Sequence, residues 1–241
     1  MTHAELPSLK STVAVVTGAG SGIGRALVAM LLARGARVAA LGRRKEKLDE
    51  LKKLHSSGEI LPLVCDVGDE AAVRGAFAEV RQIFGLVQIL VNNAGVGIPT
   101  TDLAAAEAAS FDTMFDTNVR GSFLCAREAL ADMKKSGSGH IVNVVSTAGH
   151  KSNPTAPLYC ASKFAQRGFS SGLADQALPA GIRVSEVSPG AVDSDYWGSR
   201  VVPRKNFLKV DQVASVILWV LEQPPGVVIH QVQLEALATF R

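Results

Sequence analysis

The sequence predicts an α/β protein with a doubly wound, mostly parallel seven-stranded sheet and helices on both faces. Apolar runs rich in β-branched residues alternate with segments of helical periodicity along the chain, a pattern typical of βαβ units around a buried parallel sheet. A cluster of glycines stands between the first apolar run and the first helical segment. With 241 residues, 47% of them apolar, the chain can bury one substantial core without a linker. We therefore expect a single domain over residues 1–241.

The apolar runs define seven expected strands, and the periodic segments define six expected helices. The strands are expected at residues 12–17, 36–41, 60–65, 87–92, 139–146, 181–188 and 228–233. The helices are expected at residues 22–34, 44–56, 69–84, 107–135, 157–179 and 210–222. Because crossovers between parallel strands are right-handed, these helices would cover both faces of the sheet.

The first strand leads into a glycine-rich turn, whose sequence is Thr17-Gly18-Ala19-Gly20-Ser21-Gly22-Ile23-Gly24. A helical pattern follows this turn and ends at Gly35. Glycines allow the backbone to approach a pyrophosphate, and the free N–H groups at the start of the helix attract its charge. This order of strand, turn and helix favours a dinucleotide site. The alternative is a flexible turn without a ligand.

A tyrosine and a lysine stand four residues apart in the fifth expected helix. Residues at this spacing share one helix face, so the Lys163 ammonium would lie beside the Tyr159 phenol. A nearby positive charge lowers the pKa of a phenol, which makes Tyr159 a candidate general acid/base. Ser146 lies thirteen residues before Tyr159, at the end of a strand. Taken alone, such a pair is also typical of an ordinary helix surface.

These motifs occur together and in a characteristic order. They are Thr17-Gly-x-x-x-Gly22-x-Gly24, Asn92-Asn93-Ala94-Gly95, Ser146, Tyr159-x-x-x-Lys163 and Ser188-Pro189-Gly190. In this combination the chain resembles the short-chain dehydrogenase/reductase family, in its shorter single-domain branch. The resemblance spans residues 17 to 190. It implies a Rossmann-like fold whose own helices and loops carry the active site.

The resemblance implies a role for each of four catalytic residues. Tyr159 would exchange a proton with the substrate oxygen, and Ser146 would position that oxygen through its hydroxyl. Lys163 would lower the pKa of the phenol and bond the nicotinamide ribose hydroxyls. Asn118 would hold a water in the relay toward Lys163. Alternatively, Asn118 satisfies local backbone groups.

The resemblance also implies a set of cofactor-binding residues. They are Gly18, Gly22 and Gly24 at the pyrophosphate, Ile23 at the nicotinamide side, Asp66 and Val67 at the adenine, Asn92, Ala94 and Gly95 at the adenine ribose, Pro189, Gly190, Val192 and Ser194 at the nicotinamide, and Tyr159 and Lys163. Two of these residues have structural alternatives. Asp66 suits the cap or turn of the next helix, and Asn92 suits stabilisation of the sheet.

The end of the second strand favours NADP over NAD. An NAD enzyme normally places Asp or Glu here to accept hydrogen bonds from the ribose 2′-hydroxyl, whereas this chain has Gly42. The guanidinium of Arg43 suits a 2′-phosphate instead. Ser21 departs from many NADP-using relatives, which carry Lys or Arg at that position, so NAD stays possible. The alternative is that Arg43 belongs to a solvated, basic helix start.

Composition narrows the class of protein. A net charge of +3 without a basic, aromatic-interleaved stripe argues against nucleic-acid binding. The apolar stretches are too short to cross a bilayer, and residues 1–10 are polar, so a cytoplasmic protein is expected. Cys65, Cys125 and Cys160 read as reduced, mostly buried thiols, with Cys160 open to modification. No spacing of histidines or cysteines indicates a metal site.

The resulting hypothesis is an NADP(H)-dependent oxidoreductase acting on a small carbonyl or alcohol substrate. Loops at residues 96–101, 147–158 and 191–209 would form the pocket, and the last would cover the substrate. The pocket residues expected from these loops are Ala148, Asn153, Leu158, Tyr196 and Trp197. The resemblance implies a homodimer or homotetramer formed through the two long helices. The alternatives are an NAD-preferring alcohol dehydrogenase and a non-enzymatic dinucleotide-binding scaffold.

Overall fold

The computed structural model describes residues 8–240, so the first seven residues of the polar N-terminal segment lie outside it. Seven parallel strands form one sheet in the order β3-β2-β1-β4-β5-β6-β9. The strands are β1 (Val13–Thr17), β2 (Arg37–Gly42), β3 (Ile60–Val64), β4 (Ile89–Asn92), β5 (Gly139–Val144), β6 (Ile182–Pro189) and β9 (Gln231–Leu234). This sheet confirms the predicted fold class.

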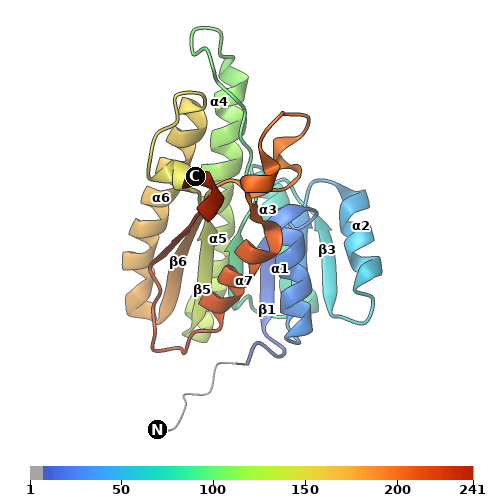
Figure 1. Ribbon diagram of the computed structural model, residues 1–241. Helices are drawn as coiled ribbons and strands as arrows, with labels where there is room; N and C mark the ends of the chain where they lie inside the picture. Colours follow the sequence, from blue (N-terminus) through green and yellow to red (C-terminus); the bar gives the residue numbers. More distant parts are fainter. Residues whose placement is uncertain (1–7, 241) are drawn as a thin grey trace.

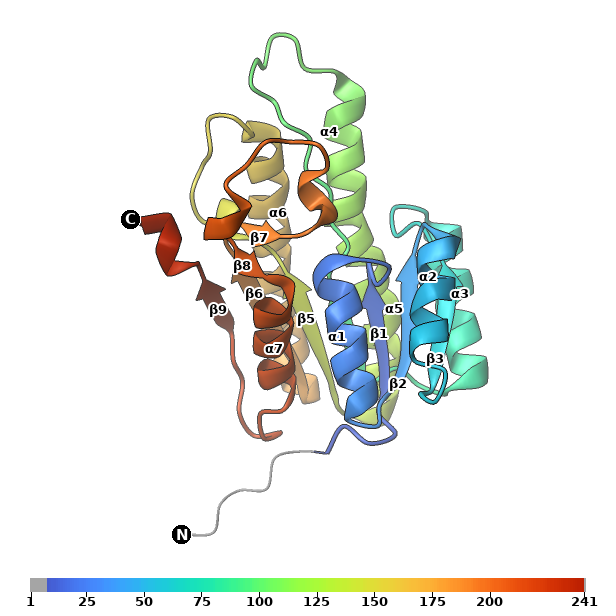
Figure 2. The same ribbon diagram turned by 45° about the vertical axis from the view of Figure 1, so that its right-hand side comes forward.

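Helices cover both faces of the sheet (Figures 1 and 2). One layer contains α1 (Gly22–Ala33), α2 (Lys45–Leu54) and α7 (Val210–Leu221), and the other contains α3 (Glu70–Ile83), α5 (Gly121–Ser136) and α6 (Pro157–Ala177). Fully buried side chains such as Leu27 in the first layer and Phe77 in the second fill the two cores. The central strands are buried on both faces, which explains their continuous apolar sequences.

The strand order reverses at β1. This strand pairs with β2 on one side and with β4 on the other, so the chain leaves β1 in one direction and returns to its opposite edge. In such sheets a crevice opens outside the carboxyl ends of the strands at the point of reversal. The glycine-rich turn follows β1 directly and therefore lies at this crevice.

The long helix predicted at residues 107–135 is interrupted. Helix α4 (Ala108–Phe115) passes into a π-helical turn, η1 (Asp116–Arg120), before α5 begins. The side chain of Asn118, within this turn, bonds residues outside the helix, namely Val96 and Ser162. A π-turn accommodates an extra residue, and such turns are frequent at functional sites.

The segment predicted as a substrate loop at residues 191–209 contains a small sheet of its own. Strand β7 (Val192–Asp193) pairs in parallel with β8 (Leu208–Lys209), and two 3₁₀ turns, η4 (Asp195–Trp197) and η5 (Arg204–Asn206), lie between them. Asp193 forms ion pairs with Arg204 at 3.2 Å and Lys209 at 2.9 Å. These contacts fasten both ends of the segment, which lies above α7 and α1 in Figure 2.

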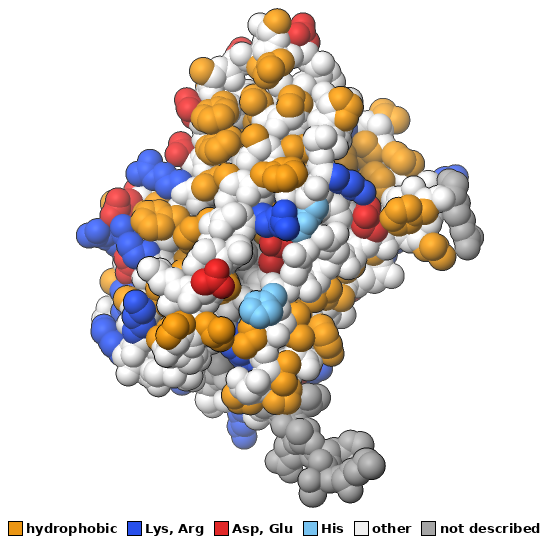
Figure 3. Space-filling view, turned by 90° about the vertical axis from the view of Figure 1, so that its left-hand side faces the viewer, with side chains coloured by type: hydrophobic (Ala, Val, Ile, Leu, Met, Phe, Trp, Pro, Cys, Tyr) orange, Lys and Arg blue, Asp and Glu red, His pale blue; other side chains and the backbone are white. Residues whose placement is uncertain are grey.

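Three further 3₁₀ turns complete the described chain: η2 (Thr147–Gly149), η3 (Leu178–Ala180) and η6 (Leu237–Phe240). The predicted helix at residues 157–179 ends at Ala177, because Pro179 cannot continue it. Within residues 8–240, no helix combines the length and apolarity needed to cross a membrane. Hydrophobic side chains gather on the upper part of the side that carries α6 (Figure 3).

Candidate active site

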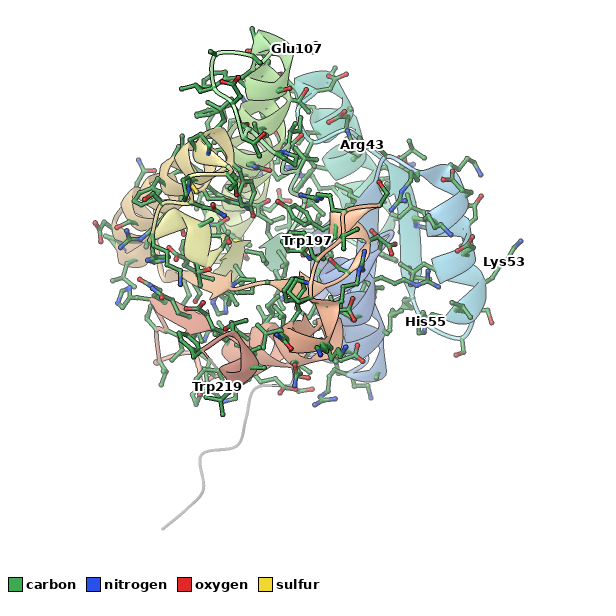
Figure 4. All side chains as sticks on the ribbon, turned by 45° about the horizontal axis from the view of Figure 1, so that its top comes forward. Arg43, Lys53, His55, Glu107, Trp197 and Trp219 are labelled. Atoms are coloured by element: carbon green, nitrogen blue, oxygen red, sulfur yellow. The ribbon has the colours of Figure 1, made fainter. Side chains whose placement is uncertain are left out.

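A cavity of about 710 Å³ opens at the carboxyl ends of the parallel strands. Its walls come from the glycine-rich turn and from the three loops predicted to form the pocket. Figure 4 shows Arg43 and Trp197 at this end of the molecule, with Trp219 on a distant edge. Ala148, Asn153, Tyr196 and Trp197 line the cavity as expected, whereas Leu158 is not part of its wall.

The glycine-rich turn forms one wall. Gly18 and Gly22 have φ angles of 65° and 53°, a left-handed conformation that side chains other than glycine rarely adopt. Gly24 does not line the cavity but allows close packing, since a Cβ there would lie 2.5 Å from the Gly18 carbonyl oxygen. Ile23, as predicted, is part of the wall. The backbone of the turn is thus open to a ligand at the start of α1.

Asn93, rather than Asn92, faces the cavity. Asn92 is buried, and its amide donates to Asn143 Oδ1 at 2.9 Å and to the Ser122 carbonyl at 3.1 Å. This is the sheet-stabilising alternative. Asn93 Nδ2 donates to the Thr17 carbonyl at 2.9 Å and so fixes the start of the glycine-rich turn. The adjacent Ala94 and Gly95 line the cavity with Asn93.

The far end of the cavity contains the residues predicted for adenine and for the 2′-phosphate. Asp66 and Val67 line it, and Asp66 Oδ1 accepts from the Gly68 N–H at 3.0 Å, so this carboxylate also closes its own turn. The cap of α3 is Asp69, not Asp66. Here Asp66 fulfils the turn alternative, while its carboxylate lies where a ligand can reach it.

Two arginines stand at this end of the cavity. Arg43 is exposed, lines the cavity, and forms no ion pair with any other residue from 8 to 240. Sequence reasoning did not single out Arg44, whose Nη2 donates to Ser21 Oγ at 3.0 Å. This bond joins α2 to the glycine-rich turn. Ser21, which the sequence singled out as a departure from many NADP-using relatives, is thus hydrogen-bonded to a neighbouring guanidinium.

Three of the four predicted catalytic residues, Ser146, Tyr159 and Lys163, line one region of the cavity. The Ser146 hydroxyl accepts from the Ala148 N–H at 3.1 Å, which holds it at the start of η2. Lys163 is buried, and its Nζ lies 5.9 Å from the centre of the Tyr159 ring. The same ammonium donates to the Val144 carbonyl at 3.3 Å and to Gln166 Oε1 at 2.8 Å.

Burial acts on the ionisation of both residues. It raises the pKa of Tyr159 above its ordinary value, and the neighbouring Tyr196 adds to this effect while the Ser146 hydroxyl opposes it. Burial also lowers the pKa of Lys163 to about 7, against the opposing charge of Glu186. The net effect on Tyr159 is thus a raised pKa, and the expectation that the Lys163 charge lowers this pKa stays a prediction. Loss of solvation outweighs the hydrogen bonding of Ser146 at Tyr159 and the charge of Glu186 at Lys163.

Asn118 lies behind the cavity wall. It is fully buried, and its Oδ1 accepts from the Val96 N–H at 2.8 Å. Its Nδ2 donates to the Val96 carbonyl and to Ser162 Oγ, each at 2.9 Å. The side chain thus satisfies nearby polar groups, which is the alternative considered for it, and anchors the loop that lines the cavity. Its role in a water relay stays a prediction.

The opposite end of the cavity contains the residues predicted for the nicotinamide, Pro189, Gly190, Val192 and Ser194. The Trp197 indole donates to the Val192 carbonyl at 2.8 Å, and the Tyr196 ring lies 6.0 Å from that of Tyr159. A Cβ at Gly97 would overlap the Tyr196 hydroxyl, so a glycine is required there for this approach. Tyr196 and Trp197 thus cover the catalytic region, with Arg200 beside both rings at 4.9 Å.

Other reactive side chains serve the structure. His140 is buried and bonds Ser185 Oγ at 2.8 Å, and His150 bonds Glu186 at 2.7 Å. All three cysteines are free and buried, including Cys160, which the sequence left open to modification. Burial raises the pKa of the Cys65 thiol to about 11. Residues 8–240 contain no group of His, Cys, Asp or Glu side chains arranged to hold a metal ion.

Comparisons with known proteins agree with this fold. The family model described as short chain dehydrogenase matches residues 12–203. A farnesol dehydrogenase of Aedes aegypti is 35% identical over 92% of this chain and 95% of its own length. An alcohol dehydrogenase of Thermococcus sibiricus complexed with 5-hydroxy-NADP superimposes with a TM-score of 0.87, at 26% identity over 94% of this chain and 97% of its own. A 3-ketoacyl-(acyl-carrier-protein) reductase of Brucella melitensis complexed with NADH gives a TM-score of 0.89, at 28% identity over 96% of this chain and 100% of its own.

Proposed function

The chain belongs to the short-chain dehydrogenase family and is an oxidoreductase, and from this premise we propose that it interconverts a carbonyl and a secondary alcohol with NADP(H). One observation carries the proposal. Ser146, Tyr159 and Lys163 line the same cavity as the glycine-rich turn, so a hydride carrier held at the turn can reach a substrate held at the hydroxyls. When bound, the dinucleotide supplies or accepts the hydride.

The side chains provide the proton and the charge. Burial keeps the Tyr159 phenol protonated at neutral pH, so it donates a proton to the substrate oxygen as the carbonyl is reduced. The Ser146 hydroxyl, fixed by Ala148, donates a hydrogen bond where negative charge develops on that oxygen. The Lys163 ammonium lies on the same helix and stabilises the phenolate that remains. In the oxidative direction the same groups act in reverse order.

The two arginines support the preference for NADP. Arg43 and Arg44 line the end of the cavity where β2 finishes in Gly42, a residue with no side-chain carboxylate to repel a phosphate. A guanidinium binds phosphate with charge-assisted hydrogen bonds. The Thermococcus enzyme was complexed with an NADP derivative and the Brucella reductase with NADH, so both dinucleotides occur on closely similar folds.

Residues 191–209, which we call the covering segment because Tyr196 and Trp197 cover the catalytic region, support an organic, partly apolar substrate. Tyr196 and Trp197 provide aromatic surface beside Tyr159, and Ile98 and Pro99 add aliphatic surface from the loop after β4. The Aedes relative is named for an isoprenoid alcohol. We propose that hydrophobic ketones and their secondary or allylic alcohols are the first compounds to test.

One experiment tests the function. Purified protein is supplied with a panel of ketones, aldehydes and alcohols and with each of NADPH, NADH, NADP and NAD, and nicotinamide absorbance is followed. The Tyr159→Phe variant should bind dinucleotide normally and lose about 10²–10⁴-fold in turnover. Near wild-type turnover in this variant would remove Tyr159 from the mechanism. Dinucleotide binding without turnover across the panel would favour the scaffold alternative.

We also propose that the chain forms a cytoplasmic homo-oligomer. Phe111, Phe123 and Phe164 expose more than 40% of their surface on the helices that the family resemblance assigns to the subunit interface. Exposed aromatic side chains are typical of an interface, and hydrophobic side chains gather on the side of the molecule that carries α6 (Figure 3). Light scattering on wild type and on Phe123→Glu checks this: the variant should dissociate into monomers.

A further inference from the structure

Gln166 lies one helical turn after Lys163 on α6 and is fully buried. Its Oε1 accepts from Lys163 Nζ at 2.8 Å, and its Nε2 donates to Ser122 Oγ on α5 at 2.8 Å. A buried amide costs free energy unless both ends are hydrogen-bonded, and here both are. The side chain therefore joins the ammonium of the active site to the neighbouring helix.

The hydrogen bonds continue from Ser122 to the other catalytic residues. Ser122 Oγ donates to the carbonyl of Asn118 at 2.8 Å, within the π-helical turn. Asn118 Nδ2 donates to Ser162 Oγ at 2.9 Å, and Ser162 Oγ donates to the Tyr159 carbonyl at 2.7 Å. One buried network thus runs from the Lys163 ammonium to the backbone of Tyr159.

Gln166 occupies one of the three donors of the ammonium. A second donor reaches the Val144 carbonyl at 3.3 Å, so one N–H remains for a ligand in the cavity that Lys163 lines. Without Gln166, the weaker bond to Val144 would be the remaining hydrogen bond from this buried charge to a described residue. A hydrogen bond to the charged form of a group favours that form.

The other ionisable groups near Lys163 are Tyr159 on the same helix and Glu186 on β6. The Glu186 carboxylate is bonded to His150 Nε2 and to Ser188 Oγ, each at 2.7 Å. Its charge raises the pKa of Lys163, but no hydrogen bond joins the two residues in the described chain. The direct side-chain acceptor for the ammonium is Gln166.

We propose that Gln166 is a positioning residue of the active site, which holds the Lys163 ammonium charged beside Tyr159 and fixes it to the Asn118 turn through Ser122. The inference rests on the proposed function, because it assigns Gln166 to the residue pair that would transfer the proton. It adds a residue beyond the motifs that define the site. An apolar side chain at this position would form neither the hydrogen bond to Lys163 nor the one to Ser122.

The first test needs no ligand and no turnover. Protein labelled with ¹³C at the lysine side chains is titrated by NMR, and the Lys163 signal is identified by its loss in Lys163→Met. Gln166→Met should lower the pKa of Lys163 by about one unit, because the charged form loses its acceptor. Gln166→Glu keeps the shape and adds a negative charge, and should raise that pKa by a similar amount.

The matched control is Ser185→Ala. This change removes another buried hydrogen bond, to His140, on the opposite face of the sheet. It should lower the melting temperature without moving the Lys163 titration. A Lys163 titration that is unchanged in both Gln166 variants would overturn the inference, and Gln166→Glu alone decides it if Gln166→Met does not fold.

The second test follows alcohol oxidation, in which Tyr159 must first lose its proton. Gln166→Met should reduce kcat at neutral pH about tenfold and displace the kcat profile to higher pH by about one unit, with a smaller change in KM. A profile identical to that of Ser185→Ala would show a merely structural role. If wild type shows no turnover, or if Tyr159→Phe keeps it, the proposed function fails, while the NMR titration still reports on Gln166 by itself.

Discussion

At the scale of single residues, burial decides which protonation states the site offers. Enclosure raises the pKa of Tyr159 and lowers that of Lys163 to about 7. The neutral phenol and the neutral amine are therefore more favoured in this site than they would be in water. A protonated phenol is the form needed to reduce a carbonyl, whereas oxidation of an alcohol needs the phenolate. Under the proposed function, we therefore expect the site in this form to favour reduction near neutral pH.

This asymmetry predicts opposite pH dependences for the two directions. Reduction should fall by less than about tenfold between pH 6 and pH 8, because Tyr159 stays protonated while Lys163 loses its charge as the pH passes about 7, whereas oxidation should rise with pH by up to about tenfold per unit. Initial rates in both directions at saturating substrate measure this. The residual activity of Tyr159→Phe should lack the slope, and an oxidation rate that does not vary with pH would contradict the assignment.

A second residue-scale prediction concerns stability in acid. Burial, together with the charge of Arg183, lowers the pKa of His140 from 6.5 to about 3. The unfolded chain therefore binds a proton that the folded chain does not, and the free energy of unfolding falls as the pH drops from 6.5 toward 3. The contribution is at most about 1.4 kcal/mol per pH unit.

Urea unfolding at several pH values checks this contribution. His140→Gln, which cannot titrate, should show a smaller loss of stability with acid than wild type. His230→Gln, at an exposed histidine, is the control and should follow wild type. Equal slopes for wild type and His140→Gln would contradict the prediction.

At the scale of elements, periodicity and turn residues predicted most of the fold, and long-range contacts account for the departures. The π-helical turn was not predicted because its cause lies outside the helix, in bonds from Asn118 to Val96 and Ser162, 22 and 44 residues away. The small sheet of β7 and β8 was not predicted because each strand has only two residues. Asn92 and Asn93 are adjacent asparagines that the sequence alone does not distinguish. Asn92 is the last residue of β4 and is buried in the sheet, whereas Asn93 follows the strand and faces the cavity.

The covering segment provides a prediction at this scale. Phe207 packs against Trp197 with ring centroids 5.1 Å apart, and it is not part of the cavity wall. Phe207→Ala should raise KM for the carbonyl substrate about tenfold, since one aromatic contact of up to about 1.5 kcal/mol holds the Trp197 turn in place. NADPH affinity, measured by fluorescence titration, should stay the same.

The control lies on the same segment. Val201 is fully exposed, so Val201→Ala should leave KM unchanged. If both variants behave alike, the aromatic contact does not order the segment. If NADPH affinity falls together with substrate affinity in Phe207→Ala, the change acts on the whole cavity and not on its cover.

At the scale of the whole molecule, the parallel sheet gathers distant parts of the sequence at one edge. The carboxyl ends of β1, β4, β5 and β6 all lead into the cavity wall, so a dinucleotide there would contact loops from most of the sheet. Binding across so many elements stabilises the folded chain as one unit, by an amount that depends on ligand concentration relative to Kd. Cofactor preference can therefore be measured as a property of the entire fold.

The melting temperature should report the preference for NADP. At a concentration of 100 times Kd, NADP should stabilise the protein by about 2.7 kcal/mol, or roughly 5–10 °C for a domain of this size. The same concentration of NAD should give a smaller shift, because Gly42 offers no acceptor to a 2′-hydroxyl while Arg43 suits the phosphate.

Arg43→Ala removes a charge-assisted bond of about 1.5–3 kcal/mol and should abolish most of the difference between NADP and NAD. Gly42→Asp should reverse it. Lys53→Ala removes a charge from α2, the helix that follows Arg43, at a point far from Arg43 (Figure 4), and should retain the wild-type preference. Equal shifts with NAD and NADP in wild type would mean that Arg43 belongs to a solvated helix start.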